Sequence, residues 1–172
     1  VRDGDHWVLN GQKVWITNGF NCGVVLVECK TDPSAGSKGV SLIAVEEGTP
    51  GFTRSQPMDK IGLKAQDTAE LFFDNVRVPL SNLVGEEGRG FVYLMQQLPQ
   101  ERLVIALRSC ATLETQLEKT IAYTTERKVF GNPIIGFQNS KFKLAEAKAY
   151  IAMLRAFVDQ CALEHVNGGI TS

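Results

Sequence analysis

The sequence predicts an α+β chain, in which an antiparallel β-sandwich or barrel is followed by antiparallel helices of an up-down four-helix bundle. Short apolar and β-branched runs separated by turn-forming residues fill the first half of the chain. Apolar residues at alternating spacings of three and four fill the second half. The pattern changes at Gly85-Glu86-Glu87-Gly88, so we place the β domain at residues 1–87 and the helical domain at residues 88–172.

Five or six short strands are predicted in the first half: His6–Leu9, Lys13–Thr17, Val24–Cys29, Val40–Val45, Glu70–Phe73 and Val76–Val78. Asn10-Gly11 favours the positive φ angles of a type I′ turn, so the first two strands are predicted to form a hairpin. Asp74-Asn75 predicts a second turn that joins the last two strands. The stretch 30–39 is rich in Pro, Gly and Ser and predicts a loop.

Three helices are predicted in the second half. A short helix, Phe91–Leu98, is expected to end at Pro99, which then opens a second helix because a first helical residue needs no N–H donor. This second helix is predicted to end at about Arg127, and a third to span about Asn139 to His165. Two long amphipathic helices joined by a short loop should pack antiparallel, and further helices or partner subunits are expected to complete their core.

Charge and composition argue against several functional classes. The net charge is -1 and the 18 basic residues are spread along the chain, which gives no electrostatic basis for binding nucleic acid. No apolar run is long enough for an integral membrane segment. The four cysteines form no CxxC pair, so no metal site is expected. The chain opens without Met or a signal peptide, and we expect it to be a piece of a larger protein.

Glu101 is the candidate catalytic residue. With Pro99 opening its helix, Glu101 would lie in the first turn, where the helix dipole and the neighbouring Arg102 stabilise a carboxylate. Within a closed apolar pocket the same carboxyl group would act as a base. The alternative interpretation is ordinary charge decoration, because acidic residues are common in a first helical turn.

Two further segments carry residue types that suit an aromatic, phosphorylated ligand. Trp15 and Thr17 share one face of a strand, so Trp15 would stack on a flat ring and Thr17 would form one hydrogen bond. Arg127 offers a guanidinium fork for a diphosphate, with Phe130 near a ring and Gln138 further along. The alternatives are a core tryptophan in a sandwich strand and the basic residues typical of a helix C-terminus.

The ordered set of motifs resembles the acyl-CoA dehydrogenase family over nearly the whole chain. The motifs that carry the resemblance are Trp15-Ile16-Thr17-Asn18-Gly19, Asp59-Lys60-Ile61-Gly62, Asn75-Val76-Arg77-Val78-Pro79, Gly85-Glu86-Glu87-Gly88-Arg89-Gly90-Phe91, Arg127-Lys128-Val129-Phe130-Gly131 and Gln138. The segment 98–103, Leu-Pro-Gln-Glu-Arg-Leu, is most similar to the long-chain acyl-CoA dehydrogenase branch.

The resemblance implies an FAD-dependent enzyme. The segment Trp15-Ile16-Thr17 would lie against the flavin, with Trp15 covering the ring system and Thr17 hydrogen-bonding near N5. A second segment would reach the FAD of a neighbouring subunit, which implies a homotetramer. In that segment Arg127 would meet the diphosphate, Phe130 would pack on the cofactor and Gln138 would bond its polar middle.

The resemblance also implies the reaction, conversion of an acyl-CoA substrate to trans-2-enoyl-CoA in fatty-acid β-oxidation. Glu101 would take the α-proton while the β-hydrogen passes as hydride to flavin N5; in other branches the base lies on a downstream segment. The acyl pocket would be lined by three residues that core packing explains equally well: Phe91, Met95 and Leu98. Arg102 would anchor the carboxylate segment or form a purely structural ion pair.

The resemblance implies electron-transfer flavoprotein as the partner, and the bacterial cytoplasm or mitochondrial matrix as the compartment. An acyl-CoA oxidase of the same superfamily is the near alternative, and a non-catalytic assembly module that kept the fold is the alternative from another class. Because the upstream β segment and other helices of the family are missing, this piece alone is expected to bind FAD poorly and to show no turnover.

Overall fold

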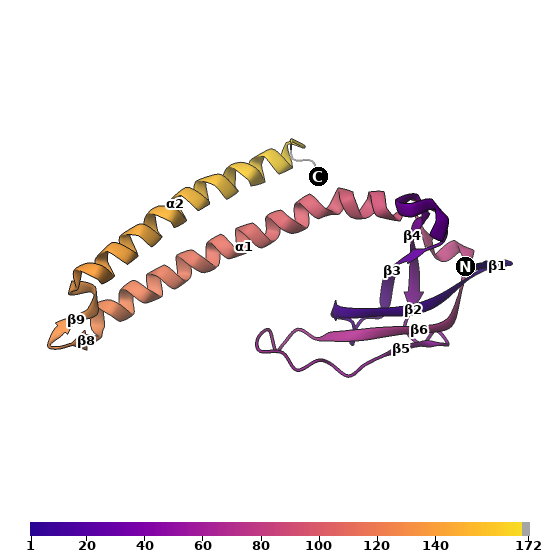
Figure 1. Cartoon of the computed structure of the whole chain (residues 1–172), viewed down its shortest axis with the longest axis horizontal. Helices are drawn as coiled ribbons and strands as arrows, with labels where there is room; N and C mark the ends of the chain where they lie inside the picture. The colour runs from indigo at the N-terminus through magenta and orange to yellow at the C-terminus, as the bar shows by residue number, and fades with distance from the viewer. Residues whose placement is uncertain (170–172) are drawn as a thin grey trace. The chain divides into compact units, whose positions relative to one another are not determined.

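The computed structural model describes residues 1–169 and divides the chain into two compact units, residues 1–94 and 95–172. The first unit consists mainly of antiparallel strands, and the second is built on two long helices (Figure 1). The predicted order of antiparallel sheets followed by antiparallel helices is therefore confirmed. The predicted domain boundary after residue 87 stays a prediction.

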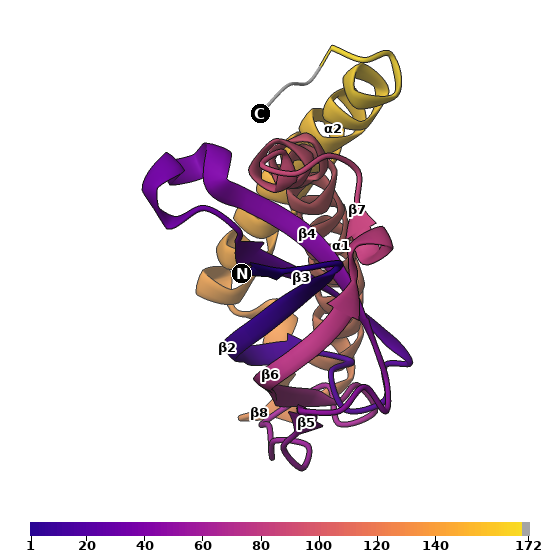
Figure 2. The ribbon, with the colours of Figure 1, turned by 90° about the vertical axis from the view of Figure 1, so that its right-hand side faces the viewer.

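Two antiparallel sheets form the first unit. One has the order β1-β2-β6-β5, with bounds Arg2–Asp3, His6–Thr17, Thr68–Pro79 and Phe52–Arg54. The other has the order β3-β4-β7, with bounds Val24–Lys30, Val40–Glu46 and Leu83–Val84. Short 3-10 helices η1 (Pro33–Gly39) and η2 (Leu80–Asn82) connect strands. Figure 2 shows β2 and β6 running side by side.

Side chains from both sheets enclose one apolar core. Strand alternation produces it: on β6, Leu71 and Phe73 are buried, while Phe72 between them is half-buried. The ring of Phe73 stacks on that of Phe52 with their centroids 5.0 Å apart. The core residues are Trp7, Leu9, Val27, Ile43, Val45, Phe52, Leu71, Phe73, Val76 and Val78.

The predicted hairpin at Asn10-Gly11 and the predicted turn at Asp74-Asn75 are both wrong, because β2 and β6 are each continuous 12-residue strands. Their turn-forming residues lie opposite each other, where the register shifts and Asn75 takes a φ of 51°. The Asn75 backbone N–H donates to Asn10 Oδ1 at 2.8 Å, and Asn10 Nδ2 donates to Asn75 Oδ1 at 3.3 Å. The asparagines therefore form a β-bulge and satisfy each other's polar groups.

The glycine-rich segment before the first long helix is seated on β4. Helix α1 spans Gly90–Glu126, and a Cβ on Gly90 would lie 2.9 Å from the Ser41 backbone. Ser41 is fully buried, and its hydroxyl accepts a 2.9 Å hydrogen bond from the Gly88 N–H and pairs with Thr31 Oγ1 at 2.8 Å. A backbone without side chains is needed for so close an approach.

The predicted helix break at Pro99 is wrong, because α1 runs through it without interruption. Pro99 lies inside the helix, where it removes the donor for the Met95 carbonyl and its ring crowds that carbonyl. Glu101 therefore does not lie in a first helical turn, and the predicted stabilisation by the helix dipole, which acts within the first turn, does not apply. Packing of the long helix outweighs a local proline cost of about 3 kcal/mol.

Helix α2 spans Gln138–Val166 and runs antiparallel to α1 in the second unit, as predicted (Figure 1). Between the helices lie the hairpin strands β8 (Lys128–Val129) and β9 (Asn132–Pro133) and the 3-10 helix η3 (Ile134–Gly136). Many large apolar side chains of the two long helices remain exposed: Val104, Ile105, Leu113, Tyr123, Phe142, Tyr150, Met153, Phe157 and Leu163. This exposure agrees with the expectation that other helices or subunits complete the core, which stays a prediction.

A bidentate ion pair joins the two helices. Arg155 Nε donates to Glu114 Oε1 at 2.8 Å and Arg155 Nη2 donates to Glu114 Oε2 at 2.5 Å. These hydrogen bonds hold the pKa of Glu114 below its usual value. A carboxylate with a lowered folded-state pKa stabilises the fold above its unfolded-state pKa, and this stabilisation is lost as the pH falls through the folded-state value.

We therefore expect Glu114→Gln to lower the melting temperature of the full-length protein at pH 7, and the difference from wild type to shrink below about pH 4. The measurement is thermal unfolding at a series of pH values. Glu118→Gln is the matched control, because Glu118 is exposed on the same helix and has no ion-pair partner among residues 1–169. A loss of equal size at every pH would show that the ion pair is not its cause.

Candidate active site

Trp15 stands at a second bulge, near the end of β2. Lys13 pairs with Leu71 and Ile16 with Ala69, so β2 holds one extra residue there. Trp15 takes a φ of 62°, which is unfavourable for a bulky side chain, and 69% of its surface is exposed. Ile16 packs against the core, whereas Thr17 is exposed like Trp15. Strain and exposure at a large aromatic residue are typical of functional sites rather than of core packing.

Asp67 holds the turn that follows Thr17. Its carboxylate accepts hydrogen bonds from the Phe20 backbone N–H at 2.9 Å and from Asn21 Nδ2 at 2.8 Å. Its backbone carbonyl accepts a further hydrogen bond from the Asn18 N–H at 3.0 Å. The segment after Trp15 is therefore anchored to the residues just before β6.

Two cations brace the same region. Lys60 Nζ donates to Thr68 Oγ1 at 3.0 Å and to the Gln66 carbonyl, and the buried Thr68 pairs with Thr17 across the ladder. Arg54 Nη1 donates to the Phe20 carbonyl at 2.5 Å. Sequence reasoning missed these supporting residues. The local signals are the turn-forming pair Asn18-Gly19, which indicates a tight turn but not its partners, and the motif Asp59–Gly62, which contains Lys60 but does not indicate its contacts.

The predicted substrate residues lie on the first turns of α1. Phe91, Met95, Leu98 and Arg102 recur at helical spacing and so share one face of the helix. Met95 and Leu98 are half-buried, and Phe91 and Arg102 are exposed. Glu101 is also exposed, and lies about 100° around the helix from Arg102, the angle between successive residues of an α-helix. Glu101 therefore lies beside the helix face that carries the four predicted substrate residues.

The residues predicted to reach the FAD of a neighbouring subunit lie at the other end of the helical pair, around the connection between α1 and α2. Arg127 directly follows α1, and its carbonyl accepts a 2.9 Å hydrogen bond from the Ile134 N–H. Phe130 and Gly131, at φ 53° and 82°, form the tip of the β8–β9 hairpin, where 92% of Phe130 is exposed. Gln138 is the first residue of α2 and is exposed. All three residues therefore belong to the short connection between α1 and α2, which the hydrogen bond from Ile134 to Arg127 closes at its base.

Glu101 and Arg127 are far apart within the second unit. Arg127 follows Glu101 by 26 residues along a continuous helix, which corresponds to about 39 Å at 1.5 Å per residue. One subunit therefore cannot apply both side chains to the same reacting centre.

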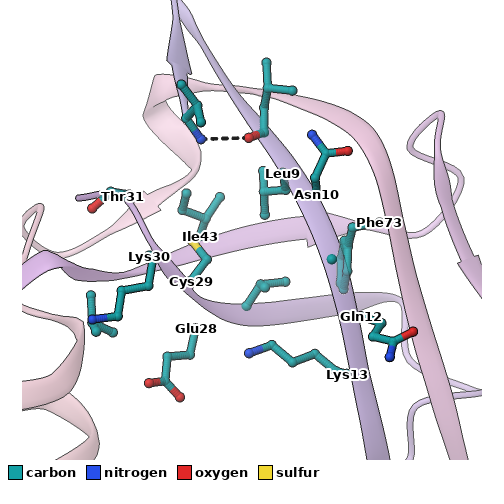
Figure 3. Close-up of a pocket in the computed structure, with 15 residues that line it drawn as sticks. Leu9, Asn10, Gln12, Lys13, Glu28, Cys29, Lys30, Thr31, Ile43 and Phe73 are labelled. Carbon is teal, nitrogen blue, oxygen red and sulfur yellow. Dashed lines mark hydrogen bonds between the residues drawn. The ribbon is translucent and has the colours of Figure 1, made fainter. Parts of the chain in front are cut away.

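A cavity of about 420 Å³ lies in the first unit, and none of the predicted site residues lines it (Figure 3). It lies between β2 and β3, with Leu9, Ile43 and Phe73 among its apolar lining. Cys29 also faces it, and burial raises the pKa of that thiol. Among residues 1–169, no cluster of His, Cys, Asp and Glu is arranged to hold a metal ion, and no helix there is long and apolar enough to cross a membrane.

Comparison with known proteins places these elements in one family. Residues 1–76 match the family "Acyl-CoA dehydrogenase, middle domain" and residues 88–172 match "Acyl-CoA dehydrogenase, C-terminal domain". The chain is 51% identical to the "Long-chain specific acyl-CoA dehydrogenase, mitochondrial" of Sus scrofa over 166 residues. The aligned region covers 95% of this chain and 39% of that protein.

Solved structures show the same likeness. The acyl-CoA dehydrogenase from Geobacillus kaustophilus superposes with a TM-score of 0.95 at 48% identity, covering 98% of this chain and 45% of that one. A chain in the structure titled electron transferring flavoprotein of Acidaminococcus fermentans superposes with a TM-score of 0.90 at 35% identity, covering 99% and 45%. The chain spans about two fifths of the length of the curated relatives it matches. It belongs to the acyl-CoA dehydrogenase family.

Proposed function

We propose that the full protein is an FAD-dependent acyl-CoA dehydrogenase that forms trans-2-enoyl-CoA from medium- to long-chain acyl-CoA. The observation that carries this proposal is Trp15, exposed and held at a positive φ beside Thr17. An exposed tryptophan with a positive φ gains no stability from burial and holds its backbone in an unfavourable conformation. Binding of a ligand explains this position better than packing in the core does. The family membership of the chain supports the identity of that ligand as FAD.

The residues present fit a flavin. Trp15 offers an open aromatic surface for stacking, and the exposed Thr17 hydroxyl lies two residues further along β2. The hydrogen bonds of Asp67 and Lys60 hold the turn after Thr17 and the strand paired with it, so the backbone that carries Trp15 and Thr17 is fixed without a ligand. When bound, FAD supplies the hydride acceptor, and the chain supplies orientation and a hydrogen bond.

Glu101 is our candidate for the base that takes the α-proton. A thioester is a weak carbon acid, so its α-proton requires a positioned carboxylate. Glu101 adjoins a helix face on which the half-buried Met95 and Leu98 would contact the acyl chain. We propose that Arg102 anchors this segment, because it lies on that face and next to the base. Phe91, one turn before Met95, would extend the apolar surface.

We propose that Arg127, Phe130 and Gln138 bind the FAD of a neighbouring subunit. The separation of about 39 Å from Glu101 supports this, because the two ends of α1 then serve different sites. An arginine fork and the N-terminus of a helix such as α2 each suit a diphosphate, since both stabilise negative charge. The exposed Phe130 ring offers a packing surface that its own unit leaves uncovered. A homotetramer is the assembly that this arrangement favours.

Arg127→Gln is expected to weaken FAD binding about 10- to 100-fold, because hydrogen bonds to a charged group contribute about 1.5–3 kcal/mol. The measurement is the FAD content of the purified protein and its dissociation constant from flavin fluorescence. Lys128→Gln is the control, because it removes one exposed positive charge from the adjacent residue. Equal losses in both variants would indicate a general charge effect and would contradict a specific diphosphate contact.

The proposed reaction is tested by mixing the full-length protein, with FAD bound, with long-chain acyl-CoA in the absence of oxygen. Bleaching of the flavin absorbance, with formation of enoyl-CoA, is the expected result. Re-oxidation of the flavin by electron-transfer flavoprotein but not by oxygen would support a dehydrogenase. That partner is the first to test, because this chain resembles a chain in the structure titled electron transferring flavoprotein. Rapid re-oxidation by oxygen would favour an acyl-CoA oxidase. Absence of FAD from the purified protein would favour a non-catalytic assembly module.

A further inference from the structure

The turn that follows Thr17 is tight and bonds back to its own strand. Asn18 takes a φ of 59°, and the Gly19 N–H donates to the Ile16 carbonyl at 3.1 Å. Cys22 Sγ donates to the Gly19 carbonyl at 3.1 Å. The position of this turn therefore fixes the backbone of Thr17 on its C-terminal side.

Two side chains from outside the turn hold the two sides of Phe20. Its N–H donates to Asp67 Oδ1 at 2.9 Å, and its carbonyl accepts from Arg54 Nη1 at 2.5 Å. Arg54 is itself fixed, because Nη2 lies 3.2 Å from Glu47 Oε1 and the guanidinium lies 5.3 Å from the centre of the Phe52 ring in the core. A carboxylate and a guanidinium thus hold the same residue of the turn from opposite sides of its backbone.

Among the described residues, the side chain of Asp67 has hydrogen-bond partners only in this turn. Its second oxygen accepts from Asn21 Nδ2 at 2.8 Å, and its backbone carbonyl accepts from the Asn18 N–H at 3.0 Å. Within residues 1–169 it forms no ion pair, so neutral N–H donors alone satisfy this half-buried carboxylate. Removing the carboxylate would release the turn at Phe20 and Asn21 and leave the rest of the unit unchanged.

The placement of the Thr17 hydroxyl depends on this turn. Trp15 takes a φ of 62° and is largely exposed, so neither a relaxed backbone nor core packing fixes the residues before Thr17. Thr17 pairs with Thr68 across the ladder, and the turn begins at the next residue. If the turn moves, the strain at Trp15 can relax and the Thr17 hydroxyl shifts with it. A displacement of about 1 Å in a group that orients the reacting atoms costs about 100-fold in rate.

We propose that Asp67 is a positioning residue for hydride transfer, which fixes the turn at residues 18–21 so that the Thr17 hydroxyl keeps its hydrogen bond to the flavin. This inference rests on the proposed function, in which the β-hydrogen of the acyl chain leaves with its electron pair to FAD and the α-proton goes to Glu101. Asp67 needs no contact with FAD or acyl-CoA in this role, because it acts only through the turn.

Asp67→Ala in the full-length protein with FAD bound is the test. We expect anaerobic flavin bleaching by long-chain acyl-CoA to slow about 10- to 100-fold, while the dissociation constant for acyl-CoA stays within about 2-fold of wild type. Asp67→Asn keeps an oxygen that accepts from the Phe20 N–H, so it should bleach within about 3-fold of wild type. An Asp67→Asn rate as low as that of Asp67→Ala would assign the effect to charge and overturn the proposal.

Asp59→Ala is the matched control. The Asp59 side chain is 95% exposed and its ion-pair partner within residues 1–169 is Lys64, so this variant should bleach like wild type. Visible circular dichroism of the bound flavin, at saturating FAD and below each melting temperature, should change in Asp67→Ala but not in Asp59→Ala. A lower melting temperature of Asp67→Ala with unchanged dichroism and bleaching would show a merely structural role and overturn the proposal.

Thr17→Val shows whether Asp67 acts through Thr17. The hydroxyl is absent in that background, so adding Asp67→Ala should slow bleaching by less than about 3-fold more. A further loss as large as that in wild type would mean that Asp67 acts by another route, which overturns the proposal.

Asn21→Ala gives a second test if Asp67→Ala does not fold or retains no FAD. It removes one hydrogen bond of the Asp67 carboxylate from an exposed position and should slow bleaching about 3-fold, whereas a wild-type rate would overturn the proposal. If wild type binds FAD but does not bleach, the proposed function fails and this inference fails with it. If wild type bleaches and Asp67→Ala bleaches equally fast, only this inference fails.

Discussion

Glu101→Gln is expected to leave FAD bound and to slow flavin bleaching by acyl-CoA by about two to four decades. Glutamine keeps the size and polarity of the side chain but cannot accept the α-proton. The structure places Glu101 inside α1, on an exposed surface next to the face that carries Met95 and Leu98. A loss confined to the bleaching rate, with unchanged affinity for the acyl-CoA, would identify an interaction made only in the transition state.

The measurement is anaerobic stopped-flow spectroscopy of the full-length protein. Glu118→Gln is the control on the same helix, and it should bleach like wild type because Glu118 lies 17 residues further along. If Glu101→Gln also bleaches at the wild-type rate, the base lies elsewhere, and the likeness of the segment 98–103 to the long-chain branch does not extend to its catalytic residue. If wild type itself fails to bleach despite bound FAD, the proposed reaction is wrong, whatever Glu101 does.

Gly39→Ala is expected to destabilise the full-length protein by about 3 kcal/mol or more. A Cβ on Gly39 would lie 1.8 Å from the Asp32 carbonyl oxygen, and a backbone group cannot move aside as a flexible side chain can. Any shift would also disturb the Gly39 carbonyl, which accepts hydrogen bonds from the Thr31 N–H at 2.9 Å and the Asp32 N–H at 3.2 Å. These bonds close the loop between β3 and β4.

Thermal unfolding and soluble yield measure this effect, with Gly23→Ala as the matched control. Gly23 is exposed, and an added Cβ would meet no atom within 4 Å, so this variant should stay within about 0.5 kcal/mol of wild type. Equal melting temperatures for Gly39→Ala and wild type would mean that the loop has room to rearrange. The comparison separates the clash from the general entropy change of replacing glycine by alanine.

Local turn propensity predicted a hairpin at Asn10-Gly11 and a turn at Asp74-Asn75, and tertiary pairing replaced both with one β-bulge. Asn10-Gly11 and Asp74-Asn75 both carry turn-forming residues, and each alone is a reasonable turn. The strands on either side of them pair along their length, so the two asparagines meet across the ladder instead of reversing the chain. Sequence cannot reveal this from either segment, because the alternative partner of Asn10 lies 65 residues away.

Pro99 misled the prediction of α1 for a related reason. Proline removes one helical hydrogen bond, which is a local cost, whereas the helix continues because the rest of its length is a good helix with an antiparallel partner. The candidate base therefore belongs to a continuous helix, and the reason first given for its stabilisation does not hold. The assignment of Glu101 as the base rests on its motif and its neighbours.

The sequence by itself determined the fold class, the strand and helix content of each half and the candidate residues, because periodicity and short motifs are local properties. Tertiary structure decided the exposure, the hydrogen-bond partners and the spacing of those residues. Only the fold shows that Trp15 is strained and exposed, that Asp67 and Lys60 hold its turn, and that one helix separates Glu101 from Arg127 by about 39 Å. These properties depend on contacts between distant segments, and such contacts are set by packing and strand pairing.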